Sequence, residues 1–199
     1  VTGTTTLSGM GGDGIDLSGS TGGSFSFGDV DITGLDAGTG LNLAGGDATL
    51  TMSSLDVTGT GTAGSRGIDI SGTQNGRTVT ITNGGTISDV ATGIVLGTNG
   101  AAGAAPSANF TFGGGSISGS NYALDGIGVN AGDGTYAFGS TAFTGGFNFA
   151  VSLSNNYYVA ATATGTGDGS STDNRASIAT AIAMASTLGT VNFVLINDG

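Results

Sequence analysis

The chain has 199 residues, of which 42 are glycine, and it carries a net charge of −11 at pH 7. With only three basic residues it lacks the positive charge that binding to nucleic acids or to anionic membrane surfaces requires. Histidine and cysteine are absent, which excludes disulfide bonds, Ser-His-Asp and Cys-His triads and the usual zinc ligands.

A hexapeptide with an apolar–Asp/Asn–apolar centre recurs along the chain. It reads GIDLSG, GLNLAG and GIDISG, and with a fourth copy its starts are Gly14, Gly40, Gly67 and Gly93, at spacings of 26, 27 and 26 residues. A looser copy, GIGVNAG, starts at Gly126 after an alanine- and glycine-rich insertion, and a degenerate copy starts at Ala150. A repeat of this length that holds several short strands predicts a solenoid.

Each repeat contains three short runs in which apolar and polar residues alternate. The hexapeptide is run one; run two reads SFSF, TLTM, TVTI, NFTF and TYAF, and run three reads VDIT, LDVT, GTIS, GSIS and TAFT. Alternation places apolar side chains on one face of a strand and polar ones on the other. The sequence therefore predicts an all-β, right-handed parallel β-helix of about six turns over residues 1–165, with three strands per turn and successive turns about 4.8 Å apart.

The alignment of the repeats predicts which side chains point inward. Run one contributes Ile15, Leu41, Ile68, Ile94 and Ile127, beside Leu17, Leu43, Ile70, Leu96 and Val129. Run two contributes Phe25, Leu50, Val79, Phe110 and Tyr136, beside Phe27, Met52, Ile81, Phe112 and Phe138. Run three contributes Ile32, Val57, Ile87, Ile117 and Phe143. Seven of the 13 aromatic residues fall in these columns, and we expect those seven to form core.

The period breaks in residues 166–199. STDNRASIATAIAMASTLG predicts a helix over about 174–188, with Thr172 or Asp173 as its cap and Gly189 as its stop. TVNFVLIN predicts a strand over about 190–196. Because an open solenoid end exposes unpaired backbone groups, this segment is expected to cap the solenoid or to begin a further module.

The repeats GIDLSGSTGGSFSF and GIDISGTQNGRTVTITNGGTIS resemble those of the right-handed parallel β-helix in bacterial autotransporter passengers and large repeat adhesins, over roughly residues 4–165. Residues 167–193, GDGSSTDNRASIATAIAMASTLGTVNF, resemble the segment that starts pectate-lyase-like β-helices. The first resemblance implies an extracellular, non-catalytic role. The second carries no catalytic residue over, because the active-site turns of that family follow this segment and here it ends the chain.

The outward column of run one is the first candidate site. It reads Asp16, Asn42, Asp69, Val95 and Gly128. Stacked carboxylates hold calcium in pectate lyases and form acid–base pairs in polygalacturonases, so weak Ca²⁺ binding or a polysaccharide lyase or hydrolase is one interpretation. Two strand spacings separate Asp16 from Asp69 by roughly 9–10 Å, and only Arg66 is placed to serve as a base. We favour a solvated ladder without a catalytic residue.

Two further outward columns are candidates. Asp29 or Asp31 forms a short acidic column with Asp56 on run three, for which weak cation binding is the alternative to a solvated face. Run two presents a regular hydroxyl face whose main members are Thr49, Thr51, Thr78, Thr80 and Thr111. Paired threonine columns resemble the array of ice-binding solenoids, whereas threonine is also simply a good outward strand residue.

The sequence favours a non-catalytic extracellular module of a bacterial surface protein: a stalk, an adhesin segment or a self-assembling fibre subunit. We expect no enzymatic activity and no resident cofactor. The expected partners are other copies of the chain, joined end to end or laterally, the parent surface protein, or a carbohydrate or cell-surface ligand. Nucleic acids and insertion into a membrane are not expected, since the longest apolar stretch, around residues 178–188, is too short to span a bilayer.

Overall fold

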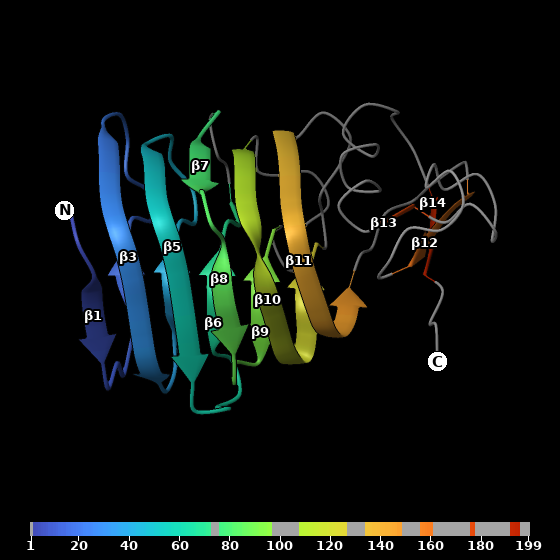
Figure 1. Cartoon of the computed structure of the whole chain (residues 1–199), viewed down its shortest axis with the longest axis horizontal. Helices are drawn as coiled ribbons and strands as arrows, with labels where there is room; N and C mark the ends of the chain where they lie inside the picture. Colours follow the sequence, from blue (N-terminus) through green and yellow to red (C-terminus); the bar gives the residue numbers. More distant parts are fainter. Residues whose placement is uncertain are drawn as a thin grey trace.

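The computed structural model describes residues 2–72, 76–96, 108–126, 134–148, 156–160, 176–177 and 192–195. Within them the chain winds into an all-β parallel solenoid of about 5 turns, whose strands stand side by side along the long axis (Figure 1). The solenoid strands are β1 (Thr5–Ser8), β2 (Ile15–Asp16), β3 (Ser24–Leu35), β4 (Thr39–Asn42), β5 (Thr49–Gly59), β6 (Arg66–Asp69), β7 (Thr78–Ile81), β8 (Gly85–Ser88), β9 (Thr92–Val95), β10 (Ala108–Asp125) and β11 (Gly134–Asn148).

The pairing of the strands confirms the expected arrangement of the three runs. Strands β2, β4, β6 and β9 are run one, while β3, β5, β10 and β11 each continue from run two into run three. Run two and run three of the third turn are the separate strands β7 and β8. Every pair among the described strands is parallel. In a solenoid each strand lies beside the equivalent strand of the next turn and runs in the same direction, as it does here.

The predicted columns of run two and run three are confirmed residue by residue. In run two, Leu50 pairs with Phe25 below it and with Val79 above it, and Phe110 continues the column to Tyr136. In run three the column is Ile32, Val57, Ile87, Ile117 and Phe143. Alternation sufficed here because a one-residue slip would turn every apolar side chain outward.

The predicted register of run one is wrong in its last turn. Ile94 pairs with Leu124 and Val95 with Asp125, so Leu124 takes the place expected for Ile127, and Asp125 the place expected for Gly128. Both ALDG and GIGV fit the apolar pattern of the hexapeptide. The structure uses the first because it keeps the link from run three to run one as short as in the turn before. Ile117 and Leu124 have the same separation along the chain as Ile87 and Ile94.

The glycine that opens each hexapeptide is required by close packing. It lies where run one faces the run-three column, and a Cβ on Gly67 would meet the Ile87 side chain and would lie 2.5 Å from the carbonyl oxygen of Gly93. The equivalent glycines Gly14, Gly40 and Gly93 would likewise meet both the run-three side chain of their own turn and the backbone of the next turn. The repeat therefore starts with glycine because no side chain fits there.

The core is fully enclosed in the middle turns and partly open in the first. Leu41 and Leu50 are 0% exposed, whereas their first-turn counterparts Ile15 and Phe25 are only partly buried. On the run-three side the first turn is already enclosed, since Ile32 is 0% exposed. Leu7, Met10, Leu17 and Phe27 also pack against the core while remaining partly exposed. Towards β11 aromatic rings fill the interior, with the Phe110 and Phe138 ring centroids 5.7 Å apart and those of Phe138 and Phe143 5.3 Å apart.

A second, three-stranded sheet holds β12 (Asn156–Ala160), β13 (Ala176–Ser177) and β14 (Asn192–Leu195) in the order β13-β12-β14. Strand β14 falls within the strand expected at about 190–196. Most of the helix expected at about 174–188 lies outside the described residues, and the two residues of it that are described form β13. The degenerate repeat from residue 150 also lies outside them. Among the described residues no helix is long and apolar enough to cross a membrane.

Candidate functional site

The outward polar residue of run one makes the same local hydrogen bond in three successive turns. Asp16 accepts the backbone N–H of Ser18 at 2.9 Å, and Asn42 accepts that of Ala44 at 3.1 Å. Asp69 accepts the backbone N–H of Ser71 at 2.8 Å. Bonds of this kind, from a short side chain to the N–H two residues on, stabilise a bend in the backbone. The column therefore turns the chain at the end of run one.

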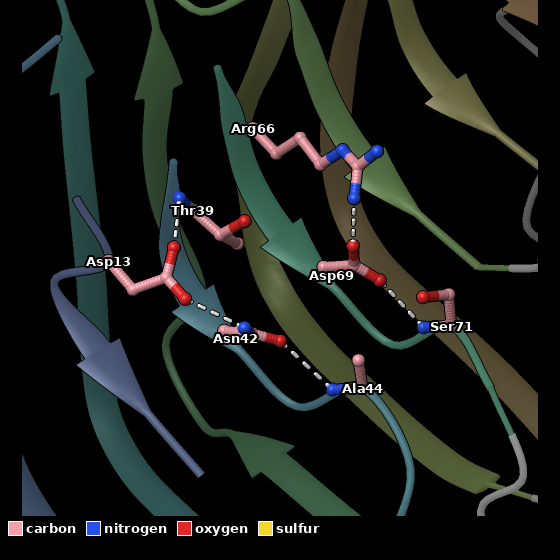
Figure 2. A network of polar contacts seen from close by, with 7 residues as sticks. All are labelled: Asp13, Thr39, Asn42, Ala44, Arg66, Asp69 and Ser71. Atoms are coloured by element: carbon pink, nitrogen blue, oxygen red, sulfur yellow. Dashed lines mark hydrogen bonds and ion pairs between the residues drawn. The ribbon is translucent and has the colours of Figure 1, made fainter. Parts of the chain in front are cut away.

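The second polar atoms of Asn42 and Asp69 have different partners (Figure 2). Asp69 Oδ2 forms an ion pair with Arg66, and Asn42 Nδ2 donates to Asp13 Oδ2 at 2.7 Å. The other oxygen of Asp13 accepts the backbone N–H of Thr39 at 2.7 Å. The bonds of Asp13 join the first turn to the second. The Arg66–Asp69 ion pair lies within one strand, β6, of the third turn.

Burial along this column is uneven, and the expectation of a solvated ladder is wrong for Asp69. Asp16 is exposed, Asn42 is half-buried and Asp69 is only 3% exposed. Asp16 lies in the first turn, on β2, which among the described residues is the end strand of the sheet and pairs with β4 on one side. Deeper in the solenoid the same position is enclosed. A buried carboxylate must be paired, and Arg66 supplies the charge that pairs Asp69.

The acid–base interpretation of this column depends on Arg66 and on the spacing and pKa of the carboxylates. The guanidinium of Arg66, the one candidate base that the sequence indicated, is bound to Asp69. Asp16 and Asp69 lie on strands separated by β4, so they are not adjacent. Hydrogen bonds from Ser18, first from its side chain and then from its backbone, lower the pKa of Asp16 below its ordinary value. A lowered pKa favours the carboxylate, whereas a general acid needs a raised pKa.

The acidic column of run three is present as expected. Asp31 and Asp56 are direct neighbours on β3 and β5, and Asp29 neighbours Ser54. Ser54 donates its hydroxyl to Asp29 at 2.8 Å, and Asp56 accepts the backbone N–H of Thr86 at 2.7 Å. Across the described residues no three histidine, cysteine, aspartate or glutamate side chains come together as a metal site. Weak Ca²⁺ binding thus stays a prediction.

The hydroxyl face of run two is assembled in register. Thr51 neighbours Thr80, which neighbours Thr111, and Thr78 neighbours Asn109. Thr51, Thr78 and Thr111 are exposed, while Thr49 and Thr80 are half-buried. We define the run-two face as the ten outward residues of this run, which are Ser24, Ser26, Thr49, Thr51, Thr78, Thr80, Asn109, Thr111, Thr135 and Ala137. None of the ten is charged.

Arg77 is a residue that the sequence did not single out. Its side chain is fully buried at the corner where run one passes into run two, and Nη2 donates to the carbonyl oxygens of Gly45 at 2.7 Å and of Leu17 and Ser20 at 3.3 Å. Burial lowers the pKa of Arg77 from its ordinary value, and the charge of Asp47 opposes that shift. One guanidinium thus ties three successive turns together. Arginine is usually exposed, so its sequence gave no signal of this role.

Comparisons complete the description of the site. The chain matches no family model, no curated protein and no solved structure. The parallel β-solenoid is therefore established by the structure, and an argument about function has to start from the surfaces and contacts described above.

Proposed function

We propose that the chain is a non-catalytic, extracellular structural module of a bacterial surface protein, acting as a stalk, an adhesin segment or a self-assembling fibre subunit. The observation that carries the proposal is the continuous stacking of inward columns over about 5 turns. In the middle turns the inward side chains, such as Leu41, Leu50 and Val57, are 0% exposed. Parallel pairing along the axis and interlocked apolar side chains make such a body stiff.

The polar contacts support a structural role. The outward polar residues of run one bond to the turns of their own backbone, and Asp69 is neutralised by Arg66. Buried Arg77 donates hydrogen bonds to backbone carbonyl oxygens of two other turns. Hydrogen bonds of this kind stabilise the backbone turns of the solenoid. The acidic surface keeps an extracellular module soluble and keeps its copies from aggregating without specificity.

A mechanical experiment tests this proposal directly. The chain is pulled from its two ends between flanking marker domains in an atomic force microscope. We expect the solenoid to come apart turn by turn, with each step releasing about 26 residues, the repeat length, or roughly 90 Å of extended chain. Unravelling without steps at forces below those that unfold the marker domains would contradict a role as a stalk or fibre subunit.

Turnover experiments test the main alternative. A polysaccharide lyase or hydrolase that uses Asp16 and Asp69 would release unsaturated or reducing ends from an acidic or neutral polysaccharide panel, and Asp16→Ala would abolish that release. We expect no release by the unmodified chain. Turnover that Asp16→Ala abolishes would overturn the non-catalytic role.

The exposed threonines of run two support ice binding as a second candidate. Exposed Thr51, half-buried Thr80 and exposed Thr111 stand in register on three neighbouring parallel strands, and a repeating lattice of water could engage such a regular column. Ice binding predicts thermal hysteresis that is lost in Thr51→Tyr and in Thr80→Tyr, because a large ring interrupts the regular threonine column. Hysteresis that survives both substitutions would place ice binding elsewhere, and its absence from the unmodified chain would remove this candidate.

A further inference from the structure

Charge is distributed unevenly around the solenoid. Run one presents Asp13, Asp16 and the Arg66–Asp69 pair, and run three presents Asp29, Asp31 and Asp56. The run-two face carries no charged side chain over the five turns that it spans. In a chain with a net charge of −11, this is the face on which another acidic body can approach without opposing carboxylates.

The run-two face is also built of short side chains. Serine, threonine, asparagine and alanine project one above the other at the strand spacing of about 4.8 Å. Another copy of this solenoid has the same strand spacing, so its outward columns match those of the first copy. Two such sheets can pack face to face at about 10 Å, as stacked β-sheets do.

We propose that two copies of the chain associate laterally through the run-two face, with the outward columns of one copy packed against those of the other. The contact is isologous, because the same face serves both copies, and it leaves the acidic columns of run one and run three pointing away from the partner. This inference rests on the proposed structural role, since it describes how such modules join side by side in a surface layer or bundle.

The association is expected to be weak for a single pair of copies. Run two is four residues long in each of five turns, so its face measures roughly 20 Å by 10 Å, or about 200 Å². A standard interface buries roughly 800 Å² per partner. Salt strengthens the association, because screening reduces the repulsion between two acidic bodies. This salt dependence is opposite to that of a contact built from ion pairs.

Sedimentation velocity of the purified chain tests the proposal with two matched variants. Thr51 and Thr58 are exposed, outward threonines of the same strand, β5, on the run-two and run-three sides respectively. Thr51→Lys and Thr58→Lys reduce the net negative charge equally, so general repulsion falls by the same amount in both. We expect dimers of the unmodified chain that increase with concentration and salt, unchanged or slightly stronger association of Thr58→Lys, and about tenfold weaker association of Thr51→Lys.

Three outcomes would overturn the lateral contact. They are a chain that stays monomeric at every concentration and salt level, equal weakening in both variants, and dimers that persist unchanged in Thr51→Lys. If the monomeric chain instead adheres to ice or to an insoluble neutral polysaccharide through Thr51, the face belongs to that ligand. Circular dichroism of both variants serves as the control for folding. A monomer that still unravels in steps under force leaves the structural role standing, so the two failures are distinguishable.

Discussion

Run one and run two both repeat outward polar residues in successive turns, one per strand in run one and two in most strands of run two, yet these residues do different things. Asp16, Asn42 and Asp69 bond to the backbone of their own turns, and they become progressively buried along the axis. Thr51 and Thr111 project from the middle of a straight strand and are exposed. A recurring polar residue at the end of a strand serves the next bend, whereas one in mid-strand is left for the surface.

The position that should be most sensitive to substitution is the glycine that opens run one. Gly67→Val places two methyl groups where a single Cβ already meets Ile87 and the backbone of Gly93, so turns three and four must separate. We expect a loss of at least about 3 kcal/mol in the free energy of unfolding, measured by urea denaturation. The control is Gly12→Ala, since an added Cβ there meets nothing within 4 Å. A Gly67→Val chain as stable as this control would show that the turns are not closely packed.

Asp69→Ala is expected to have the next largest effect. It removes the bond to the N–H of Ser71 and leaves Arg66 without its ion pair. An unsatisfied backbone donor and a lost charge pair together predict a loss of about 2 kcal/mol. The double variant Asp69→Ala with Arg66→Ala separates the two contributions, because the charge penalty is then absent. If Asp69→Ala alone costs no stability, the turn does not depend on this carboxylate.

The run-two and run-three columns could be predicted because alternation leaves one register in which phenylalanine, leucine and isoleucine are buried. The last turn of run one could not, since Leu124 and Ile127 are both apolar and lie three residues apart. The turn bonds of Asp16 and Asn42 had a signal, a short oxygen-bearing side chain two residues before the bend. The contact of Asn42 with Asp13 depends on which residues of neighbouring turns face each other, and burial of Arg77 contradicts its usual preference.

Asp16→Ala should have a smaller effect than Asp69→Ala, because Asp16 is exposed. The expected loss is under about 1 kcal/mol. Its hydrogen bonds hold the folded-state pKa below the unfolded value, so the stabilisation is present above the ordinary aspartate pKa and disappears as the pH falls through the lowered one. The unmodified chain and Asp16→Ala should therefore differ in urea midpoint at neutral pH and converge in strong acid. A difference that grows as the pH falls would mean that the carboxylate is not hydrogen-bonded when folded.

Thr51→Val should have the smallest effect, and it tests the other side of the comparison. Valine keeps the shape and the strand preference of threonine and removes only the hydroxyl, so we expect a change within about 0.5 kcal/mol of zero in the free energy of unfolding. The same measurement on Asp69→Ala provides the scale. A loss above about 1 kcal/mol would show that the hydroxyl of Thr51 stabilises the fold. The run-two face would then resemble run one, and the reason to assign it to a partner would disappear.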